Sequence, residues 1–233
     1  MSTIETMEQL LKSIDIIDMS RTLEPGMPNW PTQPPYSAIV YETQKWGAES
    51  FHRGIFMSEH TGTHVDAGSH FVPGKESVDE IPIDRLMGRA VNVDATKTAK
   101  CKCFEKEELI RFEENYGEIK AGDIVYFRFG WDEKYDLKPE GSEFMQDWPG
   151  ISKEIGNYLL EKEVKAVGTD CMSLDAYGST NPNHTLLLGN DINIIENVNR
   201  LKDLPIFFYT MGLPCKLKDG SGSTLRLIAF IDK

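Results

Sequence analysis

The segment His60–Phe71 reads H-T-G-T-H-V-D-A-G-S-H-F and holds three of the five histidines of this 233-residue chain. Histidine is the commonest protein ligand of transition metals, and it is the side chain best suited to proton transfer near neutral pH. A chain so poor in histidine has no compositional reason to place three of them around one aspartate, Asp66. The segment therefore predicts a metal-dependent active site.

The spacing within this segment predicts a bent chain. A helix would place His60 and His64 on one face, but two β-branched threonines and a glycine lie between them and disfavour a helix. On a straight strand the two histidines would stand roughly 13 Å apart at about 3.3 Å per residue. Zinc–nitrogen bonds measure only about 2.0–2.1 Å, so one ion could not reach both. We therefore expect a strand over Phe51–Ser58 that runs into a curled ligand loop, with bends at Gly62 and Gly68.

The segment resembles the H-x-G-T-H-x-D-x-P-x-H-F signature of the metal-dependent cyclase family, which includes bacterial kynurenine formamidases and isatin hydrolases. Further matches follow in the family's order over most of the chain. They are Ile17–Ser20 with Pro25–Pro31, Ala121–Val125, Pro149–Ser152, Val167–Asp175, and His184 with Glu196 twelve positions later. Each short match is weak alone, but their common order and spacing are specific.

The resemblance implies a role for individual residues. The residues implied as ligands of a two-metal site are His60, His64, Asp66, His184 and Glu196. His70 would transfer protons without being a ligand. Gly68 stands where the family has proline, so the loop before His70 lacks a fixed φ and is expected to be more permissive. This departure leaves open how His70 is aimed and which substrate is preferred.

Several of these residues also have a plainer interpretation. His184 follows the turn signal Thr180–Asn183 and, without its offset to Glu196, would be an ordinary turn or core histidine. Glu196 ends an apolar run, so its carboxylate either turns to solvent or meets a cation. Asp170 and Asp175 lie in the family-like region, but acidic residues are common at strand ends and in turns, and we leave them outside the site.

Aromatic residues offer a further hypothesis about the substrate. Trp30 and Trp131 are candidates to wall an aromatic pocket, with Trp30 as the expected substrate contact. The alternative is that both tryptophans simply pack in the core.

The element pattern predicts one α/β domain rich in strands. The capping pair Ser2 and Glu5 and the apolar spacing after it predict a helical extension over residues 1–14, ahead of a hydrolase domain over residues 15–233. Strands are expected at Tyr36–Thr43, Phe51–Ser58, Arg89–Asp94, Asp123–Phe129, Val164–Thr169, Pro205–Thr210 and Thr224–Ile231, and helices at Lys106–Tyr116, Ser152–Glu163 and shortly after Glu196. The family resemblance implies a swivelling β/β/α arrangement.

Composition excludes several function classes. The net charge of −12 and the sequence pI near 4.9 argue against nucleic acid or an anionic membrane as a partner. No apolar run is long enough to span a bilayer, and the first residues lack a secretory signal pattern, so we expect a cytoplasmic protein. The four cysteines show no metal-site spacing and are expected to be reduced and without catalytic duty.

Imidazole and carboxylate ligands without thiolate suit Zn²⁺ best here and also suit Mn²⁺. One or two such ions activate water for attack on a carbonyl carbon. The sequence therefore predicts a metal-dependent hydrolase of a small amide, resembling kynurenine formamidase. The alternatives are an isatin-hydrolase-like lactam or lactone hydrolase and a catalytically silent metal-binding protein of the same fold. The resemblance also implies a homodimer or a higher homo-oligomer.

Overall fold

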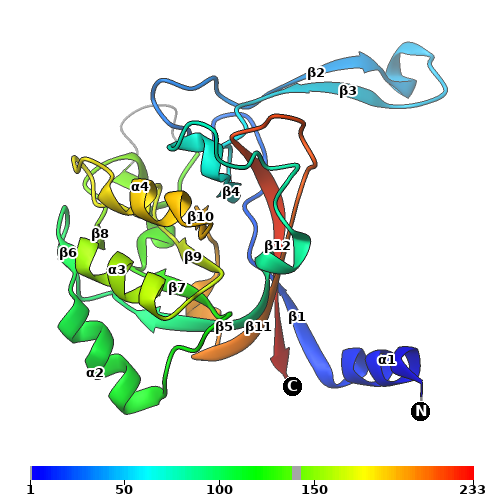
Figure 1. The fold of residues 1–233 in the computed structure, drawn as a ribbon. Helices are drawn as coiled ribbons and strands as arrows, with labels where there is room; N and C mark the ends of the chain where they lie inside the picture. The colour runs from blue at the N-terminus through cyan, green and yellow to red at the C-terminus, as the bar shows by residue number, and fades with distance from the viewer. Residues whose placement is uncertain (1, 138–142) are drawn as a thin grey trace.

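In this computed structural model, residues 2–137 and 143–233 are described. Seven strands close into a ring in the order β12-β11-β5-β7-β9-β10-β4, with β4 pairing back onto β12, and β1 lies outside against β12 (Figure 1). The strands of this sheet are β1 (Ile14–Asp18), β4 (His64–Asp66), β5 (Met87–Asp94), β7 (Ile124–Arg128), β9 (Ala166–Thr169), β10 (Asn193–Glu196), β11 (Phe207–Pro214) and β12 (Gly222–Asp232). The expected single β-rich α/β fold is confirmed.

The remaining elements surround this barrel. The helices are α1 (Thr3–Ser13), α2 (Lys106–Tyr116), α3 (Lys153–Glu161) and α4 (Pro182–Gly189), and two small sheets pair β2 (Ser37–Glu42) with β3 (His52–Phe56) and β6 (Cys103–Phe104) with β8 (Gly150–Ile151). Single 3-10 turns are η1 (Gln44–Trp46), η2 (Gly68–His70), η3 (Ile83–Leu86), η4 (Trp131–Lys134), η5 (Glu143–Met145) and η6 (Leu201–Asp203). No helix among the described residues is long and apolar enough to cross a membrane.

Alternation along the strands produces two cores. In β7, Val125 and Phe127 pack with the apolar faces of α2 and α3, whereas Ile124 and Tyr126 belong to a second cluster on the opposite face. Successive side chains of a strand point to opposite faces, and in a closed barrel one of those faces is the interior. The barrel is therefore filled with side chains, and the helices cover only one side of it (Figure 1).

Most of the expected elements are present, with shifted ends, and α2 has the predicted bounds. The capping box of Ser2 and Glu5 is confirmed, but Ile14 begins β1 and is not part of α1. The short strands β1, β4 and β10 were not expected, nor was α4, and a single 3-10 turn, η6, takes the place of the helix expected after Glu196. Elements this short carry too few residues for a clear periodicity.

Candidate metal centre

Sheet register brings two of the expected ligands face to face. The strand β4 runs between β10 and β12, antiparallel to both, with Glu196 directly opposite His64 and Ile194 opposite Asp66. Directly opposed residues of an antiparallel pair project to the same face, so their side chains meet. The His64 Nε2 atom lies 3.5 Å from Glu196 Oε2 and 3.4 Å from Asp66 Oδ1.

His60 reaches the same place from the preceding loop. The chain bends at Gly62, whose φ of 65° lies in the left-handed region that glycine adopts without penalty. The bend brings Nδ1 of His60 to 2.8 Å from Asp66 Oδ1. The predicted curled loop is therefore present, although it ends at His64, which begins the strand β4.

His184 lies on helix α4, which begins at Pro182 within the turn signal that precedes it in the sequence. Asn181, in the left-handed region with φ of 55°, precedes Pro182 at the first helical position. The carboxylate of Asp175 accepts hydrogen bonds from the backbone N–H groups of Asn183 and His184 and from the imidazole Nδ1 of His184 at 2.7 Å. This arrangement points Nε2 inward, 3.1 Å from Glu196 Oε1 and 3.6 Å from Asp66 Oδ2.

The outer nitrogens of these rings determine which atom faces inward. The Nδ1 atom of His64 lies 2.8 Å from the carbonyl oxygen of Gly62, which can only accept a hydrogen bond. In His64 and His184 the Nδ1 atom is therefore a donor to an outer partner, and Nε2 is the atom that faces Asp66 and Glu196. Ligating histidines are oriented by outer partners in this way.

The buried carboxylates of the centre favour positive charge on the groups beside them. Burial disfavours charged imidazole, but hydrogen bonds to Asp66 and Glu196 outweigh it and raise the pKa of His64 to about 10. Burial also lowers the pKa of His184, but hydrogen bonds to Asp175 and Glu196 outweigh this effect and raise the pKa to about 10. The Oδ2 atom of Asp66 is buried and accepts no hydrogen bond from any described residue. These buried acceptors fit a cation, which is the usual partner of such a donor set.

His70 lies at the edge of this cluster, on the 3-10 turn η2. Its ring stacks on that of His60 with centroids 4.0 Å apart, and its ring nitrogens have no hydrogen-bond partner among the described residues. Burial lowers the pKa of His70, so its imidazole is neutral near pH 7 and able to accept a proton. His60, Asp66 and His70 offer atoms within 4.8 Å of one another, as do His64, Asp66 and Glu196.

A cavity of about 250 Å³ opens onto these side chains. Trp30 lines it, 38% exposed and packed edge-on against Trp148, whereas Trp131 is buried and donates its indole N–H to Phe144. Trp131 is therefore a core residue, and the hypothesis that it walls the pocket is wrong.

Phe71, which the sequence did not single out, lines the pocket and contacts His184. The other lining residues include Asn29, Gln33, Ser173 and Asn181, and none of the described lining residues is Lys or Arg.

The residues that orient the candidate ligands are not predicted from the sequence. Asp175, which the sequence analysis places outside the site, holds both the backbone and the ring of His184. Asn197 donates to the carbonyl oxygen of Gly62 and lies at the pocket wall. Asp175 stood in the family-like segment, and Asn197 follows Glu196 directly, so proximity to a motif was the available signal.

Known proteins resemble this chain in sequence and in fold. The model of the Cyclase family, described as "Putative cyclase", matches residues 17–176. A kynurenine formamidase of Erythrobacter litoralis is 29% identical, with 91% of this chain and 92% of that protein covered. An isatin hydrolase of Roseibium aggregatum is 28% identical over 77% of this chain and 74% of that protein. The structure of isatin hydrolase A from Labrenzia aggregata bound to benzyl benzoate covers 100% of both chains, with a TM-score of 0.88 and 27% identity.

Proposed function

Because this chain belongs to the Cyclase family, we propose that it is a metal-dependent hydrolase that cleaves the carbon–nitrogen bond of a small amide. The chain's relatives include a kynurenine formamidase and an isatin hydrolase. The observation that carries the proposal is the convergence of inward-facing imidazole nitrogens on buried carboxylates, with Asp66 Oδ2 left without a hydrogen-bond donor among the described residues.

In the proposed ligand set, Asp66 contributes to each of two cation positions. His60, His64 and Asp66 would hold one divalent cation, and Asp66, His184 and Glu196 would hold a second. His184 Nε2 lies 3.1 Å from Glu196 Oε1 and 3.6 Å from Asp66 Oδ2. These short distances support a centre shared by the three residues. Zn²⁺ is the expected ion and Mn²⁺ a second possibility, since both accept nitrogen and oxygen ligands.

A divalent cation held there would activate water and polarise the substrate carbonyl. The protein's own residues do the remaining work. His70, neutral because burial lowers the pKa of its ring, takes up a proton at an imidazole nitrogen and delivers it to the leaving nitrogen of the amide. Trp30 and Phe71 offer aromatic faces to a ring, and the side-chain amides of Asn29 and Asn181 supply hydrogen bonds.

The pocket lining bears on the substrate. Apart from the proposed centre, its described polar residues are uncharged, so a substrate without net charge fits it best. N-Formylkynurenine, a zwitterion, is the first candidate, in keeping with the kynurenine formamidase relatives. A neutral cyclic amide such as isatin is the second candidate, because the isatin hydrolase A structure matches the whole chain, including the region of α1.

The test is a substrate screen with defined metal content. Protein stripped with a strong chelator and reloaded with Zn²⁺ or Mn²⁺ is assayed with N-formylkynurenine, isatin and simple lactones. We expect hydrolysis of one amide substrate that disappears on stripping and returns on reloading. Full activity of the stripped protein would contradict the proposed chemistry, and hydrolysis of lactones alone would contradict the assignment to carbon–nitrogen bonds.

A further inference from the structure

The outer nitrogen of His60 has a partner from a distant part of the chain. Its Nε2 atom lies 2.9 Å from the hydroxyl oxygen of Ser221, in the loop that leads into β12. Ser221 in turn donates both its backbone N–H and its hydroxyl hydrogen to Glu59 Oε2, each at 2.8 Å. Glu59 directly precedes His60, so the two ends of this chain of hydrogen bonds are neighbours in sequence.

The direction of these hydrogen bonds follows from the groups involved. An ionised carboxylate only accepts, so the single hydroxyl hydrogen of Ser221 is committed to Glu59. The hydroxyl oxygen is then left to accept, so Nε2 of the His60 ring donates its hydrogen to Ser221. With a cation bound at the centre, Nδ1 would offer its lone pair to the cation, and this is the atom that lies 2.8 Å from Asp66 Oδ1.

The backbone around Ser221 is shaped to hold this contact. The carbonyl oxygen of Ser221 accepts from Ala67 N–H at 2.9 Å, and that of Gly220 accepts from Val78 N–H at 2.8 Å. A Cβ atom on Gly222 would lie 2.6 Å from Cε1 of His60, so the ring rests directly on the glycine backbone. Gly222 therefore allows the segment to approach the ring, and backbone hydrogen bonds keep it there.

We propose that Ser221 and Glu59 are positioning residues that hold His60 in the tautomer with hydrogen on Nε2 and so strengthen cation binding at Nδ1. This inference rests on the proposed function in one respect, namely that the centre binds a divalent cation. Neither residue touches the substrate or the cation in this scheme. Their effect passes through the orientation and tautomer of one imidazole ring.

The experiment compares zinc binding by variants of the full chain. Ser221→Ala removes the acceptor of the His60 ring and should weaken zinc affinity by about 10–100-fold, the usual effect of losing an outer partner of a ligating histidine. Glu59→Ala should also weaken it, because the Ser221 hydroxyl is then free to rotate. Glu59→Gln should retain most of the affinity, since its amide oxygen still accepts from Ser221. Calorimetric titration of chelator-stripped protein with Zn²⁺ measures all three.

A spectroscopic readout separates positioning from general loosening of the fold. In zinc-loaded wild-type protein, ¹⁵N-histidine spectra should show the hydrogen of the His60 ring on Nε2, and Ser221→Ala should lose this single tautomer. The matched control is Ser223→Ala. Ser223 is buried two residues further on, and its hydroxyl bonds Cys215 N–H and the carbonyl oxygen of Thr224 without touching His60. This control should keep both the affinity and the spectrum.

The outcomes are distinguishable. Equal zinc affinity and an unchanged His60 tautomer in Ser221→Ala and Glu59→Ala overturn the inference alone. Equal losses in Ser221→Ala and Ser223→Ala also overturn it, because they reveal only a loosened strand. Failure of the wild-type protein to bind Zn²⁺ or Mn²⁺ overturns the proposed function and the inference with it.

Discussion

Asp66 is the residue on which the polar contacts of the centre converge. It lies 2.8 Å from His60, 3.4 Å from His64 and 3.6 Å from His184, and its side chain is 1% exposed. Burial alone would favour the neutral acid, but the charge and hydrogen bond of His60 and the hydrogen bond of His64 place the pKa of Asp66 well below its usual value. An ionised carboxylate surrounded by imidazoles is a strong site for a divalent cation.

Replacing Asp66 tests its role as a ligand. Asp66→Ala should lose metal stoichiometry, measured by elemental analysis of protein purified from zinc-supplemented medium, because every proposed position uses this carboxylate. Asp191→Ala, at an exposed residue bonded to Lys75, is the control and should keep its metal. A variant that retains wild-type metal content would show that Asp66 is not a ligand.

His70 is proposed to move protons and not to bind metal. His70→Ala should keep its metal content and its fold while losing on the order of 10²–10⁴ in kcat, the usual contribution of general acid–base catalysis. The measurement pairs a rate assay with elemental analysis of the same sample. If metal is lost in parallel with the rate, His70 is a ligand and its proposed role is wrong.

Asp170 gives stability a specific pH dependence. Burial, together with the charge of Asp132, outweighs three backbone N–H donors and raises the pKa of Asp170 to about 7, above its ordinary value of 3.8. Between these two values the folded state holds a proton that the unfolded chain releases, so the free energy of unfolding falls as pH rises from about 4 to about 7.

Asp170→Asn removes this titration. We measure the free energy of unfolding of both proteins by urea denaturation at several pH values. The value for wild-type protein minus the value for Asp170→Asn should decrease across that pH window. A difference that stays constant with pH would show that the Asp170 carboxyl titrates at its ordinary value.

At the scale of elements, the turn η2 aims His70, and Gly68 begins it. We expected the glycine to make this loop permissive, but hydrogen bonds hold the loop, from Ser69 N–H to Glu76 and from Val72 N–H to Gly68. A Cβ atom at Gly68 would lie 2.8 Å from Cβ of Lys75. Glycine is therefore required here by close packing between two parts of one loop.

Gly68→Ala should destabilise the protein by about 1–3 kcal/mol, the usual cost of overpacking a buried site. It should also lower kcat, because His70 stands on the same turn. Urea denaturation and a rate assay measure the two effects. The control is Gly189→Ala, where the new Cβ would lie 3.7 Å from Val72, an ordinary contact, and stability should hardly change. Wild-type stability in Gly68→Ala would show that the loop adapts.

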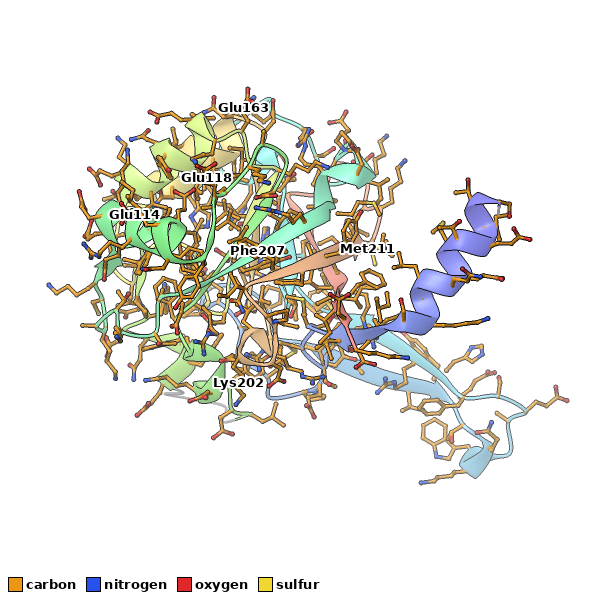
Figure 2. All side chains as sticks on the ribbon, turned by 90° about the horizontal axis from the view of Figure 1, so that it is seen from below. Glu114, Glu118, Glu163, Lys202, Phe207 and Met211 are labelled. Carbon is orange, nitrogen blue, oxygen red and sulfur yellow. The ribbon has the colours of Figure 1, made fainter. Side chains whose placement is uncertain are left out.

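At the scale of the whole molecule, two segments stand away from the barrel (Figure 1). Helix α1 has no buried residue, and Figure 2 shows it separated from the strand β11 that carries Phe207 and Met211. A cavity of about 930 Å³ with a largely apolar lining lies between α1 and the strands near it. The hairpin β2–β3 is also uncovered, and the exposed apolar residues of its two strands are Ile39, Tyr41, Ile55 and Phe56.

The family resemblance implies a homodimer or a higher homo-oligomer, and we predict that these uncovered segments pack in a homodimer. We expect light scattering at micromolar concentration to give twice the chain mass. Ile55→Asp should shift the protein toward the monomer without unfolding it, because Ile55 is 58% exposed in the single chain. Lys45→Ala, at the exposed tip of the same hairpin, should leave the dimer intact. A monomeric wild-type protein would contradict the prediction.

The sequence by itself determined the family and the class of fold, and it predicts the kind of chemistry. His60, His64 and Asp66 are close in sequence, so their side chains stay close in almost any bent conformation of that segment. The long periodic elements were predictable for a similar reason, because the apolar pattern of α2 repeats over several turns.

The tertiary structure alone decided how the centre is completed. Glu196 meets His64 only through the register of two strands too short to be predicted, and His184 is aimed by Asp175 and an unexpected helix. Glu59 and Ser221, separated by 162 positions, meet because β12 closes the barrel against β4. These contacts depend on how strands pair across the molecule, and pairing between distant strands leaves no local pattern in the chain.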